Sequence, residues 1–199
     1  MGKGEDTRSK ILDAALAQAS EGGFESLTIG TLAAHTGLSK SGLFAHFGSR
    51  EELQIAAIDA AAERFADTVF VPALKAGRGL PRVRAIFEHW LRWTEDSGLA
   101  HGCPLHAAAI EFDDRPGPVR EHLVARYEIL QRNLERAFAL AVDAGDLPAD
   151  SDPGQYAFAA LGIVFAYYHA ARLLRRPDAA DRARAAFDRL LAGAPAPAA

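Results

Sequence analysis

Five polar side chains with the chemistry to bind nucleic acid occur in one short stretch of the sequence. Ser39, Lys40 and Ser41 place two hydroxyls and an ammonium at consecutive positions. His46 and Arg50 follow and add ring and guanidinium donors. Donors of these types bind the phosphate oxygens and base edges of double-stranded DNA. The stretch therefore predicts a DNA-contact surface.

Two short helical patterns separated by a turn must position these donors. Gly37 can adopt the positive φ that a tight turn requires, and Ala33, four residues earlier, is small enough for two helices to cross closely. Leu38, Leu43 and Phe47 are expected to pack the second helix against the first helix of the chain. The opposite face of that second helix is then free to enter a major groove.

The predicted contacts divide by their place on this helix-turn-helix. Residues early in the second helix can reach base edges, and a glycine there permits close approach of the backbone. The helix caps and the later basic residues are better placed for phosphates. The predicted DNA-contact residues are Thr28, Ser39, Lys40, Ser41, Gly42, Phe44, His46 and Arg50.

Residues 37–53, with the sequence GLSKSGLFAHFGSREEL, resemble the recognition-helix signature of the TetR family of transcriptional regulators. The resemblance implies a three-helix DNA-binding head, a connecting fourth helix, and a helical domain that binds an inducer and dimerises through its last two long helices. It also implies phosphate contacts by Thr28, Ser39, His46 and Arg50, whereas Lys40, Ser41 and Phe44 would face the groove. Beyond about Phe70 the resemblance is one of layout.

Two positions depart from the family signature. Gly42 stands where the family more often has a hydroxyl-bearing residue, and Phe44 stands where it more often has tyrosine. Gly42 loses a side-chain contact and Phe44 loses a hydroxyl. Contact of the Phe44 ring with a thymine methyl and simple packing both remain open, so the operator does not follow from the relatives.

Apolar residues recur at helical spacing along the whole chain, and no window alternates as a strand would. The sequence therefore predicts an all-α fold of about nine helices. Residues 1–48 are expected to form the DNA-binding domain, 49–193 a helical ligand-binding and dimerisation domain, and 194–199 a disordered tail. Outside the helix-turn-helix, helices are predicted over residues 7–20, 49–70, 81–96, 103–112, 118–145, 153–175 and 179–191.

Bulk composition excludes several classes of protein. The formal net charge is −4, with five basic and five acidic residues in positions 1–50, so nonspecific attraction to nucleic acid should be modest. The single cysteine excludes an intrachain disulfide and cysteine-rich zinc modules. No apolar stretch has the length of a signal peptide or membrane span, which favours the cytoplasm and no membrane partner.

Aromatic and polar-tipped residues of the later helices are candidates for lining an inducer cavity. The simpler interpretation of most of them is core packing. His101, Cys103 and His106 are spaced like metal ligands, but they straddle a loop and a helix start and lack an evident fourth ligand, so no metal is predicted. The ligand-binding candidates are Trp90, Trp93, Cys103, His106, Phe112, Tyr127, Phe165, Tyr168 and His169.

The sequence is compatible with three functions. The preferred one is a ligand-responsive repressor that binds a pseudo-palindromic operator as a homodimer and is released by an unidentified small-molecule inducer. A non-catalytic protein-interaction module is the first alternative. An enzyme built in the C-terminal helical domain is the second, but the sequence has no phosphate-binding loop or nucleophile elbow, and Asp113-Asp114 fits a turn. We therefore predict no catalytic residue and no cofactor.

Overall fold

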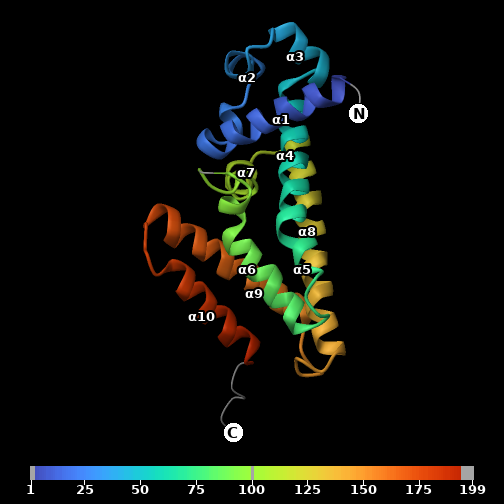
Figure 1. The fold of residues 1–199 in the computed structure, drawn as a ribbon, viewed down its shortest axis with the longest axis vertical. Coiled ribbons are helices and arrows are strands. Elements are labelled where there is room, and N and C mark those ends of the chain that lie inside the picture. Colours follow the sequence, from blue (N-terminus) through green and yellow to red (C-terminus); the bar gives the residue numbers. More distant parts are fainter. Residues whose placement is uncertain (1–2, 100, 194–199) are drawn as a thin grey trace. The chain divides into compact units, whose positions relative to one another are not determined.

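The computed structural model describes residues 3–99 and 101–193, and every regular element in those ranges is helical (Figure 1). Nine of the helices have eight residues or more, which confirms the predicted all-α fold. The long helices are α1 (Lys3–Gly22), α2 (Ile29–Thr36), α3 (Lys40–Phe47), α4 (Arg50–Phe65), α6 (Leu80–Asp96), α7 (Pro104–Phe112), α8 (Pro118–Asp143), α9 (Pro153–Tyr168) and α10 (Ala179–Leu191). Short turns are η1 (Phe24–Ser26), η2 (Ala66–Phe70), α5 (Val71–Ala73) and η3 (His169–Leu173).

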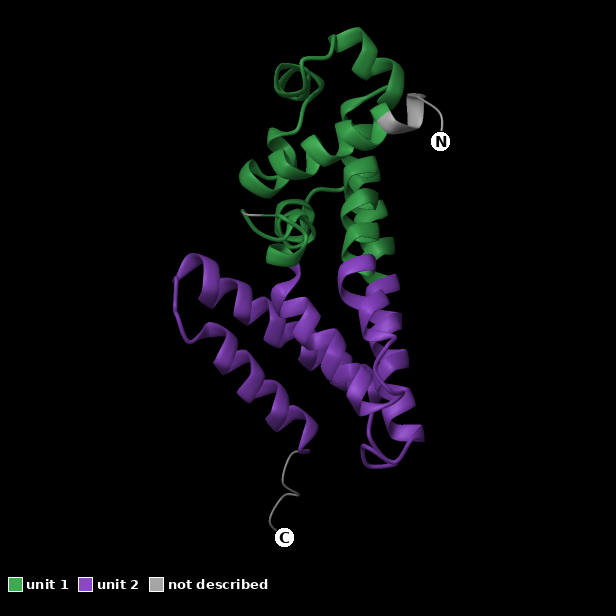
Figure 2. Cartoon of the chain, in the orientation of Figure 1, with its two compact units in different colours: residues 1–66, 94–128 green, residues 67–93, 129–199 purple. Residues whose placement is uncertain are grey.

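The chain forms two compact units, which Figure 2 distinguishes by colour. Unit 1 comprises residues 1–66 and 94–128, and unit 2 comprises residues 67–93 and 129–199. The units group the predicted head with α4, α7 and the start of α8. The predicted domain boundary after residue 48 stays a prediction, and the predicted tail, 194–199, lies outside the described residues.

The core of unit 1 forms where α1 packs against α2, α4 and α7. In this core, α1 and η1 contribute the almost completely buried side chains of Ile11, Leu16 and Phe24. Leu53 and Ile58 of α4 are fully buried as well. Burial of these apolar side chains holds α1, α2, α4 and α7 together, and α3 packs against α2 and α4.

The core of unit 2 forms between α6, the second half of α8, α9 and α10. The rings of Phe87 and Phe187 stack with centroids 3.9 Å apart, which joins α6 to α10. The Arg184 guanidinium donates to both carboxylate oxygens of Glu88 on the exposed side of the same pair of helices. Phe138 packs against Tyr156 at 5.4 Å and joins α8 to α9.

Side chains cap the starts of two long helices. Asp152 accepts hydrogen bonds from the Gly154 and Gln155 amides at the start of α9. Ser49 accepts from the Glu52 amide at 3.0 Å at the start of α4. The Ser49 amide itself donates to the Phe47 carbonyl at 2.7 Å.

Two predicted helices contain wider turns than expected. The helix predicted over 49–70 is α4 followed by the π turn η2, and α5 then continues through Pro72. Proline lacks an N–H and leaves a gap in the regular hydrogen-bond ladder, and the helix ends one residue after it, at Ala73. The helix predicted over 153–175 is likewise α9 followed by the π turn η3.

Helix α9 buries one of its sides and exposes another. Val164 and Tyr168 are buried, whereas Phe158 is 68% exposed. The backbone places Phe158 on the side of α9 away from the core of unit 2, since Ala157 and Ala160 face that core. None of the described helices combines the length and the hydropathy needed to cross a membrane.

Candidate nucleic-acid interface

Residues 28–47 form the predicted helix-turn-helix, α2 followed by α3. Thr28 caps α2: its hydroxyl accepts from the Thr31 amide at 3.1 Å, and the Thr31 hydroxyl accepts from the Thr28 amide at 3.0 Å. Gly37 adopts φ +71° in the turn, as predicted. Ser39 caps α3 by accepting from the Gly42 amide at 3.1 Å. Local capping therefore defines both helices of the motif.

Two apolar side chains anchor α3. Leu43 is fully buried and Phe47 is 3% exposed, so both pack as predicted. Leu38 does not, because 38% of its surface is exposed. It precedes the Ser39 cap, outside the helical face that Leu43 and Phe47 share, so the predicted three-residue anchor is reduced to two.

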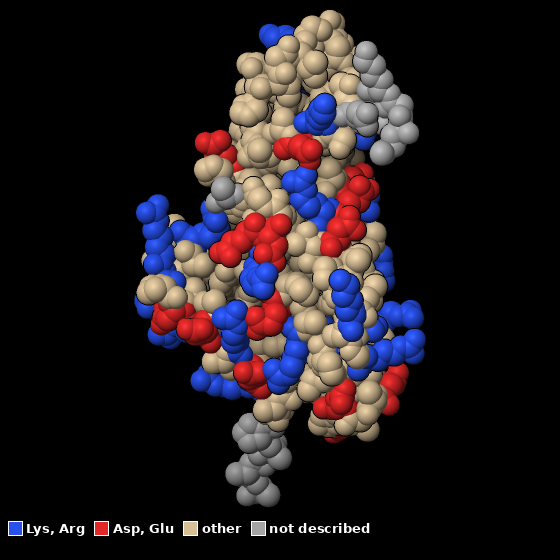
Figure 3. Space-filling view, in the orientation of Figure 1, with Lys and Arg blue, Asp and Glu red and all other residues tan. Residues whose placement is uncertain are grey.

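The outward face of α3 holds most of the predicted DNA contacts. It carries one lysine and no acidic residue, and the surface formed by α2 and α3 is largely uncharged in Figure 3. The Phe44 ring is 56% exposed, so it is available to a partner rather than packed in the core. The exposed predicted contacts on and beside this face are Ser39, Lys40, Ser41, Gly42, Phe44 and His46, and Thr28 is partly buried.

Gly42 has a local structural role besides its place on this face. A Cβ atom at this position would lie 3.1 Å from the Ser39 hydroxyl oxygen that caps α3. A hydroxyl-bearing residue, as the family signature has here, would crowd that cap. The departure at Gly42 is thus compatible with the capped start of α3.

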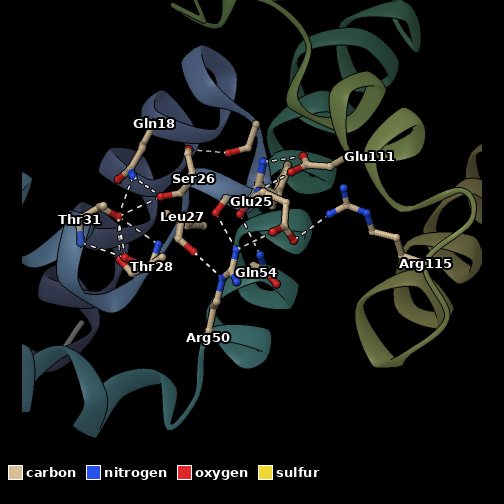
Figure 4. A network of polar contacts seen from close by, with 12 residues as sticks. Gln18, Glu25, Ser26, Leu27, Thr28, Thr31, Arg50, Gln54, Glu111 and Arg115 are labelled. Atoms are coloured by element: carbon tan, nitrogen blue, oxygen red, sulfur yellow. Dashed lines mark hydrogen bonds and ion pairs between the residues drawn. The ribbon is translucent and has the colours of Figure 1, made fainter.

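Arg50, the remaining predicted contact, has contacts within the protein (Figure 4). Its Nε donates to the Leu27 carbonyl at 3.3 Å, and its Nη2 donates to the Glu25 carbonyl at 2.6 Å. The same Nη2 lies 3.2 Å from the Glu25 carboxylate. Arg50 therefore ties the start of α4 to the segment that leads into the Thr28 cap.

The segment 23–28 is held from several elements by side chains that sequence reasoning missed. The Glu111 carboxylate of α7 accepts from the amides of Phe24, at 2.8 Å, and Glu25, at 2.5 Å (Figure 4). The buried Gln54 donates to the Phe24 carbonyl at 2.8 Å, and Gln18 donates to the Ser26 carbonyl at 2.8 Å. These partners are eight to 87 residues away in the sequence, so no local pattern indicates them.

The nine ligand-binding candidates are divided between the two units. Four of them, Cys103, His106, Phe112 and Tyr127, lie in unit 1. The other five lie in unit 2: Trp90, Trp93, Phe165, Tyr168 and His169.

The unit 1 candidates make contacts with one another and with the core. Cys103 caps α7 through its Sγ, which accepts from the His106 amide at 3.3 Å, and Tyr127 donates to the Leu105 carbonyl at 3.0 Å. Burial lowers the pKa of His106, and burial together with the nearby thiol raises the pKa of Tyr127. Phe112 packs edge-on against Phe24 at 6.5 Å.

The unit 2 candidates differ widely in burial. Trp93 is fully buried and Tyr168 nearly so, whereas Phe165 is partly buried and His169 is exposed. Trp90 lines a small apolar cavity with Phe87, Phe138 and six further residues. Its volume of about 10 Å³ is close to the room that one water molecule needs, so the core is closely packed there.

The metal-like spacing of His101, Cys103 and His106 does not produce a metal site. His101 is exposed, whereas Cys103 is buried and serves as a helix cap. Among residues 3–99 and 101–193, no group of three or more His, Cys, Asp or Glu side chains is arranged to hold a metal ion.

Comparisons with known proteins agree with this architecture. The family described as bacterial regulatory proteins, tetR family, matches residues 11–57, and the tetracyclin repressor-like C-terminal domain matches residues 79–187. A search of the curated proteins found no match.

Several solved structures are similar over most of the chain. A TetR transcriptional regulator from Chloroflexus aurantiacus is 26% identical, with 96% of each chain covered and a TM-score of 0.79. A TetR family regulator from Cytophaga hutchinsonii is 20% identical, with 98% of each chain covered and a TM-score of 0.83. AibR, solved in complex with isovaleryl coenzyme A and operator DNA, is 24% identical over 80% of this chain and 84% of its own, with a TM-score of 0.65. With both halves of the family architecture matched, the chain belongs to the TetR family of transcriptional regulators.

Proposed function

We propose that this regulator is a cytoplasmic, homodimeric repressor that binds a pseudo-palindromic operator and is released from it by a small-molecule inducer. The observation that carries the proposal is the outward face of α3. Leu43 and Phe47 fix the helix to the core, and Lys40, Phe44 and His46 are left exposed on it. A short, rigidly mounted helix with this face suits insertion into a major groove.

The proposed contacts follow from the place of each residue. Lys40 and Ser41 begin α3 and would reach base edges, and Phe44 would lie against the groove. Thr28, Ser39, His46 and Arg50 would bind phosphates. Residues 1–48 would act as the DNA-binding domain and residues 49–193 as the ligand-binding and dimerisation domain.

The outward face of α9 supports a dimer through the last two helices. α9 contains no charged residue, and Phe158 is exposed on it. Apart from the backbone of α9 and the two neighbouring residues, nothing would lie within 4 Å of a Cβ at Gly162. Leu173 and Leu174 beyond its end are also exposed. An uncharged face with a large ring and a gap at glycine suits packing against a second copy. Two heads would then bind successive major grooves.

Release by an inducer rests on differential binding. A ligand that prefers a conformation of the dimer with a different head spacing lowers DNA affinity by its differential free energy. The structure of AibR with isovaleryl coenzyme A and operator DNA supports ligand control within this fold. We leave the chemical class of the inducer open, and we propose no catalytic activity for this chain.

The test is a selection from random DNA duplexes with the full-length protein. We expect enrichment of an inverted repeat whose half-sites are about one helical turn apart. Lys40→Ala should weaken binding to the selected duplex at least about tenfold, because each dimer loses two cationic contacts. Lys75→Ala, which removes the same charge from an exposed position of unit 2, is the matched control.

Two results would contradict the proposal. Absence of any enriched inverted repeat would favour a protein-interaction module. Equal binding by wild type, Lys40→Ala and His46→Ala would remove α3 from the interface. Repeating the selected-duplex assay with metabolite pools then identifies ligands that lower the affinity.

A further inference from the structure

The Glu25 carboxylate of unit 1 lies between two guanidinium groups (Figure 4). Its Oε2 is 3.2 Å from Arg50 Nη2, and its Oε1 is 3.1 Å from Arg115 Nη1. All three side chains are about half exposed. One carboxylate is thus shared between the start of α4 and the loop that follows α7.

We propose that Glu25 is a positioning residue for operator binding, because it competes with operator phosphate for Arg50 while Arg115 weakens that competition. The inference rests on the proposed function, in which Arg50 binds phosphate. Glu25 would lower the affinity for DNA. Arg115, by binding the other carboxylate oxygen, would limit the size of this reduction.

The hydrogen bonds of Arg50 make this competition specific to the Glu25 side chain. The Leu27 and Glu25 carbonyls hold the guanidinium in place through Nε and Nη2. Within the described part of the chain, no acceptor is found for Nη1, so this group can face an external phosphate. The Glu25 carboxylate neutralises the guanidinium and repels a phosphate beside it.

The backbone keeps Glu25 where it can contact both arginines. Its amide donates to the Glu111 carboxylate at 2.5 Å, and its carbonyl accepts from Arg50 at 2.6 Å. The three charged side chains line an open groove of about 320 Å³, which also contains Glu51 and Arg120. Exposed ion pairs in such a groove are weak. A small movement of Arg115 can therefore shift the Glu25 carboxylate toward or away from Arg50.

The arrangement links the two regions that the family models match. Glu25 and Arg50 lie in the region matched by the N-terminal family model, residues 11–57. Arg115 lies in the region matched by the C-terminal model, residues 79–187. A displacement of the loop after α7 would therefore alter the charge beside a DNA-contact residue without moving α3. This is a route by which the C-terminal region can change DNA affinity.

The test measures binding to the selected duplex by fluorescence anisotropy over a range of salt concentrations, using the full-length protein. Glu25→Gln should bind about three- to tenfold more tightly, because two exposed competing pairs are removed per dimer. The slope of log affinity against log salt should become more negative by up to about 1.8, the value for two added phosphate contacts. Glu51→Gln, which removes the same charge from the same groove, should have a smaller effect and leave the slope unchanged.

The effect of Glu25 must depend on Arg50. In an Arg50→Gln background, Glu25→Gln should give no further tightening beyond the Glu51→Gln control. Arg115→Gln should weaken binding about twofold or more and should have no effect in the Glu25→Gln background. Arg120→Gln, an arginine of the same groove that donates to the Asp113 carbonyl, controls for general loss of charge.

The outcomes separate this inference from the proposed function. If Lys40→Ala weakens binding but Glu25→Gln leaves both affinity and salt slope unchanged, the competition is refuted and the proposed function stands. An equal gain from Glu25→Gln with and without Arg50 also refutes it. If Glu25→Gln lowers the melting temperature, the test rests on comparing Arg115→Gln with Arg120→Gln. If both variants weaken binding to the selected duplex equally, the inference is refuted.

Discussion

Helices α3 and α9 each leave a large aromatic ring exposed, but the residues around the two rings differ. Phe44 is 56% exposed on α3 and lies among Lys40, Ser41 and His46. Phe158 is 68% exposed on α9, a helix without a single charged residue. An exposed ring alone therefore does not identify its partner. Its neighbours indicate a polyanion at α3 and an apolar protein surface at α9.

The two helices are also fixed to the protein in different ways. α3 has eight residues and two buried anchors, and it depends on the caps at its ends. α9 has sixteen residues and packs along α10. Substitutions in the two helices should therefore have different consequences.

The largest expected effect is on stability, and it should differ between the buried and the exposed face of α3. Leu43→Ala removes a fully buried side chain and should lower the free energy of unfolding by about 2–5 kcal/mol. Phe44→Ala should change it by less than about 0.5 kcal/mol, because its ring is exposed, and should instead weaken DNA binding. Urea denaturation and anisotropy with the selected duplex measure the two quantities. Similar destabilisation by both variants would mean that Phe44 belongs to the core.

The next effect concerns the uncharged face of α9. Phe158→Glu places a charge on the proposed dimer interface and should raise the dimer dissociation constant about a hundredfold, as a buried unpaired charge requires. Sedimentation velocity over a concentration series measures it. Leu74→Glu alters a similarly exposed leucine outside α9 and α10 and is the matched control. A wild-type protein that is monomeric at micromolar concentration contradicts the dimer.

The third effect compares the caps of the two helices. Ser39→Ala and Asp152→Ala should each cost about 1 kcal/mol of stability, since each removes acceptors for helix-terminal amides. Only Ser39→Ala should also weaken DNA binding, because only α3 belongs to the proposed DNA interface. Asp150→Ala removes an exposed charge from the loop before α9 and should leave the melting temperature unchanged. Loss of DNA binding in Asp152→Ala would contradict the separation.

The smallest effect is a pH dependence in unit 1. Burial lowers the pKa of His106 below its usual value of 6.5, so the folded state favours the neutral ring. Below pH 6.5 the unfolded state binds more protons than the folded state. Lowering the pH therefore decreases the free energy of unfolding, until the pH is below the pKa of His106 in the folded state. Melting temperatures from pH 7.5 to pH 5 should fall less in His106→Gln than in wild type. His169→Gln, at an exposed histidine of η3, should behave like wild type.

Local features of the fold were predictable because short-range chemistry determines them. The caps at Thr28, Ser39 and Asp152 depend on amides two or three residues away. Gly37 has the positive φ that its place in the turn demands. The buried positions Leu43 and Phe47 follow from helical periodicity.

Failures occurred where another element decides the outcome. Leu38 satisfies the apolar pattern but precedes the helix that would turn it inward. Phe158 satisfies it as well, but the core of unit 2 covers a different side of α9. The ligand-binding candidates, chosen as aromatic and polar-tipped residues of the later helices, stay a prediction, and they are divided between the two units.

The all-α fold, the helix-turn-helix and the exposed face of α3 follow from the sequence alone, because caps, turns and periodic apolar residues act over a few residues. The contacts of Glu25 with Arg50 and Arg115, and those of Glu111 with the segment entering α2, depend instead on tertiary packing. These contacts join groups 25 to 90 positions apart, and no local rule specifies which distant side chains meet. Their pairing follows from how α1, α4 and α7 pack around one core.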